Sequence, residues 1–555
     1  MCSFHEFFKV VFEPALRMGS MSSEVDYDAI VIGAGFGGLR MLYELHTIGL
    51  SSKCFEAGSD VGGTWYWNRY PGARTDSEAW VYTMNISKEL NSDWVWQERL
   101  PPQEDVLQYL RHIADRFDLR KDIEFGTRVT SAHYDSDSNV WKVTNDNGES
   151  YSCRYLITAV GPLSAPRPPP FPGVESFRGE WYQTSSWPKT PVSFEGKRVA
   201  VIGTGATGVQ VIPTVAHEAK SVTVFQRTPP YVIPGRNYKI TEPRLKEIRR
   251  NYDQTWEQAR AQVFGMAIPN AGRTIADVRD EAHHRQILER GWETGGFYFV
   301  FNTFDDLLTN PESNEKAAEF IRHKIRAVVE DEETAEMLCP KYPILAKRPP
   351  LGHFYYEAYN RPDVKLVDIS KNPIKEMTSQ GLRTETEDYE FDIIIFAIGF
   401  DAATGALAAV DIKGENGVNL NEKWSQSLES YLGIMVEGFP NMFMISGPQS
   451  PFANIPIVID GAATWIGKAI EYMRHTGKSK IAATKASSQK WAAHVNEVFQ
   501  MTLLASAASQ VRSWYVGTNV PGKPENVLFY FGGVGTYFGI IEKEATEGFP
   551  TLEKS

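Results

Sequence analysis

The sequence predicts an α/β protein with two dinucleotide-binding, Rossmann-like domains and a helical insertion in the second of them. Three observations support this prediction. A buried strand, a glycine turn and a helix follow one another from Tyr27, and the same order returns from Arg198. Residues 235–344 are rich in charged groups at helical spacing, and the chain then returns to α/β texture.

The first unit has every part of a dinucleotide-binding fold. Its segment DAIVIGAGFGGLRMLYEL places the motif GxGxxG, which includes Phe36, on Gly33, Gly35 and Gly38. In this motif the first glycine makes a tight turn, the second lets the backbone approach a pyrophosphate, and the third lets the helix pack on the strand. The second strand ends at Glu56, where a carboxylate can accept a hydrogen bond from a ribose hydroxyl. This unit fits FAD.

The second unit repeats the pattern with a different ending. Its turn comprises Gly203, Thr204, Gly205, Ala206, Thr207 and Gly208. Arg227 and Thr228 stand where Glu56 stood in the first unit. An acid there would repel a 2′-phosphate, whereas arginine can bind one through two parallel hydrogen bonds. We therefore predict NADP(H) rather than NAD(H), with a structural salt bridge at Arg227 as the alternative.

Residues 62–76, GGTWYWNRYPGARTD, form the most unusual segment of the chain. Glycines allow the backbone to pass close to a flat ring system, and aromatic side chains can wall it. Gly63, Thr64 and Trp65 are the candidates for such contacts. The alternative is an aromatic-rich turn packed under a loop.

Local composition and residue pattern divide the chain into four parts. A proline-rich run at residues 162–172 indicates a stiff linker between the two units. Strand-like segments at residues 392–401 and 441–451 mark the return to α/β structure. The predicted parts are an N-terminal appendage (1–23), an FAD-binding domain (24–163 and 401–555), an NADP-binding domain (164–234 and 345–400) and the helical insertion (235–344).

Local periodicity predicts further elements. Apolar residues recur at helical spacing in residues 103–117, and short strands are expected around residues 140–143 and 155–160. His283 and His284 lie in the helical insertion. No further ligands stand at suitable spacing, so we predict solvated histidines and no metal site.

Composition excludes several classes of partner. The net charge of -12 gives no basic excess for nucleic acid. Only four cysteines occur, without a CxxC pair, which suits a reducing compartment rather than a disulfide scaffold. No apolar run reaches the ~18 residues of a membrane span, and residues 1–20 lack the apolar core of a secretory signal. A cytoplasmic protein is expected.

The order of these parts resembles the type I Baeyer–Villiger monooxygenases over about residues 25 to 550. That family's long fingerprint reads small-Gly-x-Trp, four residues, aromatic-Pro-Gly, three residues, Asp. It is matched by Gly62, Gly63, Trp65, Tyr70, Pro71, Gly72 and Asp76. The second fingerprint, Phe-x-Gly-x-x-x-His-x-x-x-Trp, is matched at Phe177, Gly179 and Trp187, but Gln183 replaces the histidine. Glutamine keeps hydrogen bonding and loses protonation, so we expect a structural role for Gln183.

The resemblance implies a mechanism and a set of site residues. NADPH reduces FAD, and a C4a-peroxyflavin formed with O₂ inserts one oxygen next to a ketone carbonyl, giving an ester or lactone. Arg348 aligns with the family's catalytic arginine and Asp76 with its carboxylate partner. Lys347 would join Arg227 at the 2′-phosphate, and Trp514 aligns with a tryptophan that closes over the bound nicotinamide cofactor. Without the resemblance, Lys347 and Arg348 would be an ordinary exposed basic pair.

Two other functions stay open at this point. One is a related class B flavin monooxygenase that oxidises nitrogen or sulfur in soft nucleophiles. The other is a flavin- and NADP-binding redox protein that has lost oxygenation, which only Gln183 favours. The sequence names neither the ketone nor the oligomeric state.

Overall fold

A large mixed sheet forms one half of the computed structural model, which describes residues 25–555; the expected appendage at 1–23 lies outside the described residues. The strand order is β17-β4-β5-β6-β1-β2-β3, and β18 also pairs with β6. These strands are β1 (Tyr27–Ile32), β2 (Ser52–Glu56), β3 (Ile123–Phe125), β4 (Val129–Asp135), β5 (Val140–Asn145), β6 (Ser150–Thr158), β17 (Asp411–Lys413) and β18 (Met442–Met444). Segments from both ends of the chain therefore build one sheet.

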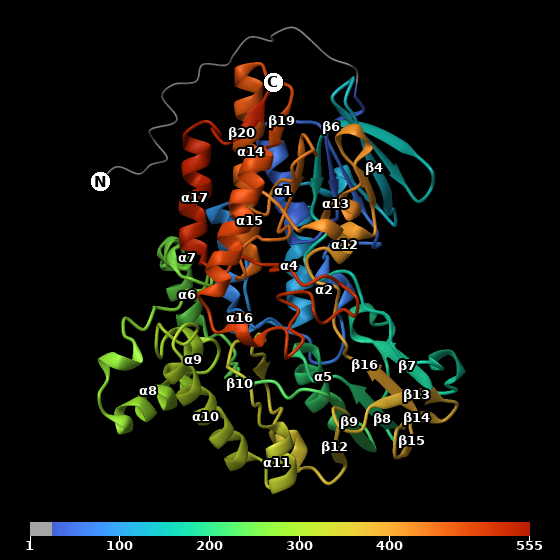
Figure 1. Ribbon diagram of the computed structural model, residues 1–555, viewed down its shortest axis with the longest axis vertical. Helices are drawn as coiled ribbons and strands as arrows, with labels where there is room; N and C mark the ends of the chain where they lie inside the picture. The colour runs from blue at the N-terminus through green and yellow to red at the C-terminus, as the bar shows by residue number, and fades with distance from the viewer. Residues whose placement is uncertain (1–24) are drawn as a thin grey trace.

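Helices from both parts of the chain accompany this sheet, and α1 packs against α14 and α4. They are α1 (Phe36–Thr47), α3 (Lys88–Asp93), α4 (Gln103–Arg116), α12 (Gly405–Ala408), α13 (Leu420–Gln426), α14 (Ile455–Thr476), α15 (Lys485–Gln500), α16 (Leu504–Ala507) and α17 (Val534–Thr546), with the strand pair β19 (Ile481–Ala483) and β20 (Leu552–Lys554). Buried Arg40 on α1 donates hydrogen bonds to Asp460 (2.9 Å) and Thr464 (2.9 Å) on α14. This charged pair fixes α1, and with it the first glycine turn, against the C-terminal half (Figure 1).

A second, fully parallel sheet has the order β12-β9-β8-β16-β7. Its strands are β7 (Glu180–Gln183), β8 (Arg198–Ile202), β9 (Ser221–Gln226), β12 (Val364–Asp368) and β16 (Ile393–Phe396), and α5 (Ala206–Ala216) follows β8. The antiparallel strands β13 (Ile374–Thr378), β14 (Gly381–Thr384) and β15 (Asp388–Glu390) form a separate three-stranded sheet. All of β16 is buried, as expected for a central parallel strand.

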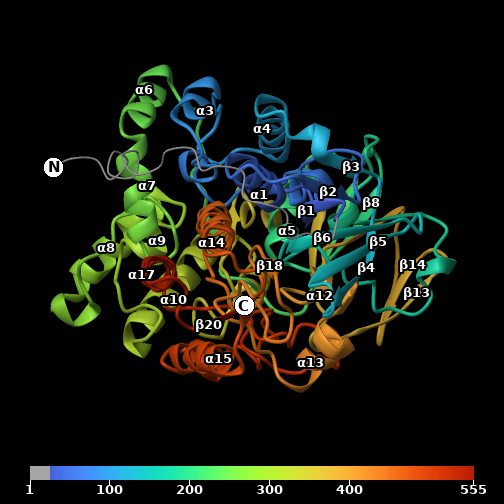
Figure 2. The ribbon, with the colours of Figure 1, turned by 90° about the horizontal axis from the view of Figure 1, so that it is seen from above.

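The predicted helical stretch between residues 235 and 344 contains six α-helices joined by irregular segments. They are α6 (Glu242–Arg250), α7 (Tyr252–Ala261), α8 (Glu281–Thr294), α9 (Tyr298–Phe301), α10 (Pro311–Val328) and α11 (Glu332–Leu338). The short strands β10 (Ile233–Pro234) and β11 (Leu351–Gly352) pair in parallel and bring the two ends of this stretch together. Figure 2 shows α6 to α10 on one side of the molecule, opposite β4, β5, β13 and β14.

One prediction for this stretch is wrong. His283 is exposed, but His284 is buried on the inner face of α8, and its Nε2 lies 2.5 Å from the carbonyl oxygen of Val278. Its ring also contacts Phe304, because helix packing turns this face toward the core. The described residues contain no cluster of three or more potential metal ligands.

Candidate active site

The first glycine turn leaves a helix N-terminus open. Helix α1 begins after Gly35 with no side-chain cap and no acid in its first turn. Gly33 has φ +100°, and a Cβ there would lie 2.7 Å from the carbonyl oxygen of Ala159. A Cβ on Gly38 would lie 1.8 Å from the carbonyl oxygen of Gly33, so the helix packs directly on the turn. The free amides at this end can hold a phosphate.

Glu56 lies at the carboxyl end of β2, beside this turn. One carboxylate oxygen accepts a hydrogen bond from the amide of Ala34 (2.7 Å), and the other accepts one from the amide of Gly58 (2.7 Å). Burial raises the pKa of Glu56, and the two amide bonds act in the opposite direction. These bonds fix the carboxylate at the edge of the turn.

The start of the aromatic stretch lies against the same turn. Gly63 has φ +52°, and a Cβ there would lie 2.9 Å from the Cα of Gly35. Helix α2 (Thr64–Trp67) starts directly afterwards, with Thr64 exposed and Trp65 buried. The indole Nε1 of Trp65 donates to the Tyr82 hydroxyl (3.2 Å). The two glycine segments therefore touch, as a backbone that passes close to a bound ring requires.

The end of the aromatic stretch reaches the second dinucleotide unit. The Tyr70 hydroxyl donates to Oε1 of Gln210 on α5 (2.8 Å). Gly72 has φ +83°, and a Cβ there would lie 2.4 Å from the carbonyl oxygen of Gln210. The stretch thus spans from the turn before α1 to α5, and Figure 1 shows α2 and α5 near the middle of the molecule.

Asp76, at the end of this stretch, forms an ion pair with Arg348. The Asp76 side chain is 10% exposed and that of Arg348 is 25% exposed. Desolvation acts to lower the pKa of Arg348, but the charge and hydrogen bond of Asp76 outweigh it and raise the pKa. The second oxygen of Asp76, Oδ1, is buried and has no hydrogen-bond partner among the described residues. Arg348 therefore stays protonated, and the carboxylate of Asp76 keeps an unused acceptor.

The second glycine turn has the same arrangement as the first, but it leaves more free space at its middle glycine. Helix α5 begins at Ala206 after Gly205, without a side-chain cap or an acid in the first turn, which includes Thr207. A Cβ on Gly208 would lie 2.3 Å from the carbonyl oxygen of Gly203, whereas a Cβ on Gly205 would meet nothing within 4 Å. The hydroxyl of Thr204 donates to the carbonyl oxygen of Thr228 (3.3 Å). The open space at Gly205 suits a phosphate group.

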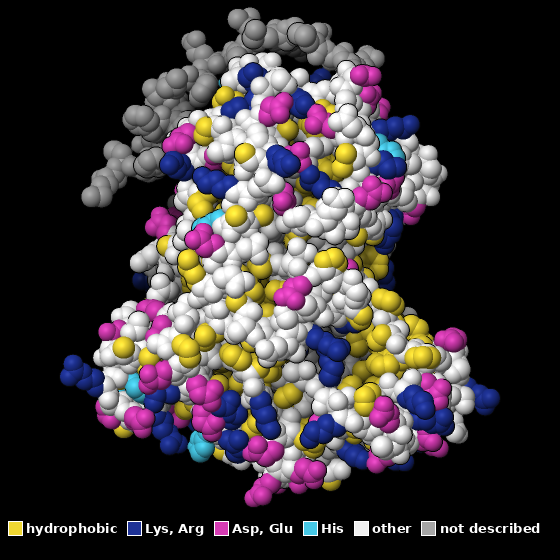
Figure 3. Space-filling model, viewed as in Figure 1, with side chains coloured by type: hydrophobic (Ala, Val, Ile, Leu, Met, Phe, Trp, Pro, Cys, Tyr) yellow, Lys and Arg dark blue, Asp and Glu magenta, His cyan; other side chains and the backbone are white. Residues whose placement is uncertain are grey.

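Cations gather beside this turn. Desolvation and the charges of Arg227 and Arg512 lower the pKa of Lys347 to about 8. Desolvation and the charges of Arg512 and Arg167 lower the pKa of Arg227. Among the described residues, no carboxylate pairs with Arg227 or Lys347, so the alternative of a salt bridge at Arg227 is not seen. Figure 3 shows Lys and Arg side chains in a hollow near the middle of the drawn face.

Gln183 ends strand β7 and holds the linker. Its Nε2 donates to the carbonyl oxygen of Arg167 (2.6 Å). This neutral hydrogen bond joins the proline-rich linker to the edge of the parallel sheet, which agrees with the structural role expected for Gln183.

Trp514 belongs to an aromatic cluster that sequence reasoning found only in part. Its ring packs against Phe452 (centroids 5.6 Å apart) and Phe529 (5.2 Å). Phe452 also contacts Phe264 from the helical stretch (5.4 Å) and Phe531 (5.2 Å). Phe264, Phe531 and Arg512 carried no signal in the sequence, because only the folded chain brings these segments together.

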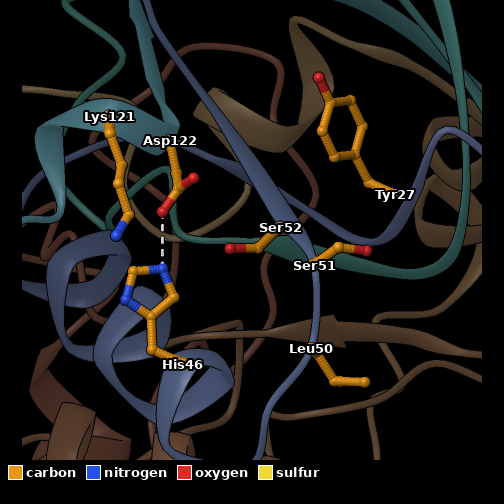
Figure 4. A pocket seen from close by; sticks show the side chains of 7 residues that line it. All are labelled: Tyr27, His46, Leu50, Ser51, Ser52, Lys121 and Asp122. Atoms are coloured by element: carbon orange, nitrogen blue, oxygen red, sulfur yellow. Dashed lines mark hydrogen bonds and ion pairs between the residues drawn. The ribbon is translucent and has the colours of Figure 1, made fainter.

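A surface pocket lies away from these residues, at the edge formed by β2 and β3. It is lined by Tyr27, His46, Leu50, Ser51, Ser52, Lys121 and Asp122, and His46 pairs with Asp122 (2.6 Å; Figure 4). None of the predicted site residues lines it. Among the described residues, no helix is long and apolar enough to cross a membrane.

Comparisons with known proteins place the chain in a family. Residues 27–245 match the model of the flavin-binding monooxygenase-like family. A Baeyer–Villiger monooxygenase of Pseudooceanicola batsensis is 41% identical, over 95% of this chain and 96% of the relative. Phenazine N-monooxygenase PhzNO1 of Lysobacter antibioticus is 40% identical, over 95% and 97%.

A solved structure agrees with these relatives. The NADP⁺-bound cyclohexanone monooxygenase from Rhodococcus sp. Phi1 superposes with a TM-score of 0.92 at 40% identity, covering 95% of this chain and 99% of that one. Near-complete coverage at this identity means that the two dinucleotide units, the helical stretch and the C-terminal return are shared as a whole. The chain belongs to the type I Baeyer–Villiger monooxygenase family.

Proposed function

We propose that this protein is an FAD-dependent ketone monooxygenase that uses NADPH and O₂ to insert one oxygen next to a carbonyl, giving an ester or lactone. The observation that carries the proposal is the ion pair between Asp76 and Arg348. It places a permanent cation at the end of the segment that begins beside the first glycine turn. Bound FAD, once reduced by NADPH, supplies the chemistry that activates oxygen.

The residues around the first turn fit FAD. The uncapped N-terminus of α1 suits the pyrophosphate, and the turn of Gly33, Gly35, Phe36 and Gly38 leads into this helix end. The carboxylate of Glu56 faces the same turn and suits a ribose hydroxyl. Gly63 touches this turn from the other side, and Gly63, Thr64 and Trp65 would border the ring system.

The residues around the second turn fit NADP(H). The free space at Gly205 and the uncapped N-terminus of α5 suit the pyrophosphate. Arg227, Thr228 and Lys347 would hold the 2′-phosphate, because Arg227 and Lys347 lie close together and pair with no carboxylate of residues 25–555. Trp514, anchored in the aromatic cluster, would cover the nicotinamide side.

Arg348 would stabilise the negative charge that develops on the carbonyl oxygen of the ketone. A guanidinium cannot act as a proton donor at working pH, so it offers charge without offering a proton. Asp76 holds it in place and raises its pKa further. The aromatic cluster around Phe452 would exclude water and favour an apolar ketone.

Oxidation of a ring nitrogen is the second candidate, because an N-monooxygenase is among the relatives at 40% identity. The test is incubation of the FAD-loaded enzyme with NADPH, O₂ and separate panels of ketones, nitrogen heteroaromatics and thioethers. Esters or lactones from the ketones support the proposal. N-oxides or S-oxides alone would replace it with the second candidate, and hydrogen peroxide alone would indicate lost oxygenation.

A further inference from the structure

Arg512 has a fixed backbone and an exposed side chain, just before Trp514. Its φ of +51° is in the left-handed region, and its amide donates to the carbonyl oxygen of Ser509 (3.0 Å). The next residue, Ser513, is fully buried, and its amide donates to Ala508 (2.8 Å). The turn after α16 therefore holds the position from which the guanidinium projects.

The segment that follows Arg512 is fastened to the parallel sheet. The Asn519 amide donates to the carbonyl oxygen of Phe400 (2.9 Å). Lys523 pairs with Asp401 and also donates to the carbonyl oxygen of Ala402 (3.2 Å). Phe400 to Ala402 come shortly after β16, the neighbour of β8. The segment therefore lies across the carboxyl edge of this sheet, where ligands of open α/β sheets bind.

Arg227 belongs to the same edge, because it directly follows β9, and β9 pairs with β8. Arg167 reaches the edge from the linker, where its Nη1 donates to the carbonyl oxygen of Ile398 (3.3 Å). Lys347 joins them, and the charge of Arg512 lowers the pKa of both Lys347 and Arg227. Four cations from four segments thus converge.

Among the described residues, no carboxylate forms an ion pair with Arg227, Lys347 or Arg512. The acid at this edge, Asp401, pairs with Lys523 from the docked segment, and its charge also acts on Arg167. Crowding like charges without a carboxylate costs free energy unless an anion shares the site. A phosphate with two negative charges can accept hydrogen bonds from more than two cations at once.

We propose that Arg512 is a third cation for the 2′-phosphate of NADP(H), so that this phosphate ties the segment carrying Trp514 to the parallel sheet. The inference rests on the proposed function, which assigns that phosphate to Arg227 and Lys347. It adds that the phosphate strengthens the docking of residues 508–524 beyond the contacts of Asn519 and Lys523. NAD(H), which lacks the phosphate, binds without this added hold on the segment.

The test uses the FAD-loaded full chain and equilibrium binding. Affinities for NADP⁺, NAD⁺, 2′-AMP and 5′-AMP are measured by calorimetry for wild type, Arg512→Gln, Arg512→Lys and the control Arg178→Gln, an exposed arginine elsewhere. Losing one charge-assisted hydrogen bond weakens binding about 10-fold. Arg512→Gln should therefore weaken NADP⁺ and 2′-AMP by about that factor and leave NAD⁺ and 5′-AMP unchanged. Arg512→Lys should recover part of the loss, and Arg178→Gln should match wild type.

Limited proteolysis gives a second readout. NADP⁺ should protect residues 508–524 of the wild type more than NAD⁺ does, and Arg512→Gln should remove the difference. An equal effect of Arg512→Gln on NADP⁺ and NAD⁺, or none, would overturn the inference. Arg227→Gln distinguishes a failure of the inference about Arg512 from a failure of the assigned 2′-phosphate site. If it lowers the preference for NADP⁺ while Arg512→Gln does not, only the inference fails; if neither does, the assigned phosphate site fails as well.

Discussion

Asp76 and Arg348 form an ion pair although 272 residues separate them in the chain. Asp76 ends a segment that begins against the first glycine turn, and Arg348 follows the helical stretch of the second unit. The pair therefore depends on the correct placement of both units. It also leaves Oδ1 of Asp76 buried and unused among the described residues, a polar atom that a ligand in the site can satisfy.

Asp76→Asn tests the carboxylate of the pair. The amide keeps the shape and some hydrogen bonding but removes the charge that raises the pKa of Arg348. We expect ester formation to fall by about 100-fold, the usual scale for a lost electrostatic contribution in an active site. Product yield and the melting temperature are measured together, with Asp137→Asn, at an exposed position, as the control. Wild-type ester rates from Asp76→Asn would show that the carboxylate only shapes the site.

Arg227→Ala tests the choice of cofactor. Removing the guanidinium should raise the KM for NADPH by about 10- to 100-fold, because a charge-assisted pair with the phosphate is lost. The KM for NADH should change little. Steady-state flavin reduction with both cofactors measures this, and Lys220→Ala serves as a surface control. Equal effects on NADPH and NADH would mean that Arg227 does not contact the phosphate.

The lowered pKa of Lys347 leads us to predict that NADP⁺ binding depends on pH. Its pKa of about 8 in the protein means that the ammonium loses its proton as the pH rises through 8. The affinity for NADP⁺ should then fall, by up to about tenfold per pH unit, while that for NAD⁺ stays flat. Binding titrations from pH 6.5 to 9.5 check this. Lys347→Arg keeps its charge and should remove the slope; a slope that persists in this variant would exclude Lys347 as its source.

Substitutions of Gln183 test whether the histidine position of the second fingerprint needs a side chain that can be protonated. Its bond to the carbonyl oxygen of Arg167 needs a donor and no charge. Gln183→His should therefore leave the ratio of ester formed to NADPH oxidised unchanged, and Gln183→Ala should lower it by loosening the linker. Both ratios are measured at pH 7 and pH 9. A large gain in coupling from Gln183→His would show that protonation at this position matters.

Local patterns were sufficient for much of the fold. The two strand–turn–helix units follow from glycine spacing and buried runs, and the helix expected at residues 103–117 is α4 (Gln103–Arg116). The prediction that His284 is solvated was wrong, because its burial depends on which face of α8 packs inward. Periodicity describes a helix but does not say what lies beside it.

Less of the site than of the fold could be predicted from the sequence. Arg348 is one of two adjacent basic residues, and only the resemblance to the family marked it. Phe264 had no distinguishing neighbours in the sequence, and Arg512 lies close to Trp514 but outside any motif. They reach the site through contacts between distant segments, such as Lys523 with Asp401 and Phe452 with Phe264. Long-range packing of this kind leaves no local trace in residue spacing.

Arg348→Ala, assayed for flavin reduction and ester formation in the same reaction, tests the central claim most directly. The glycine turns and the basic cluster remain in this variant, so NADPH should still reduce the flavin. Ester formation should fall at least 100-fold, and oxygen consumption should end in hydrogen peroxide. Arg348→Lys should recover only part of the activity, since an ammonium is a point charge without the guanidinium's planar fork. Full ester yield from Arg348→Ala would contradict the account.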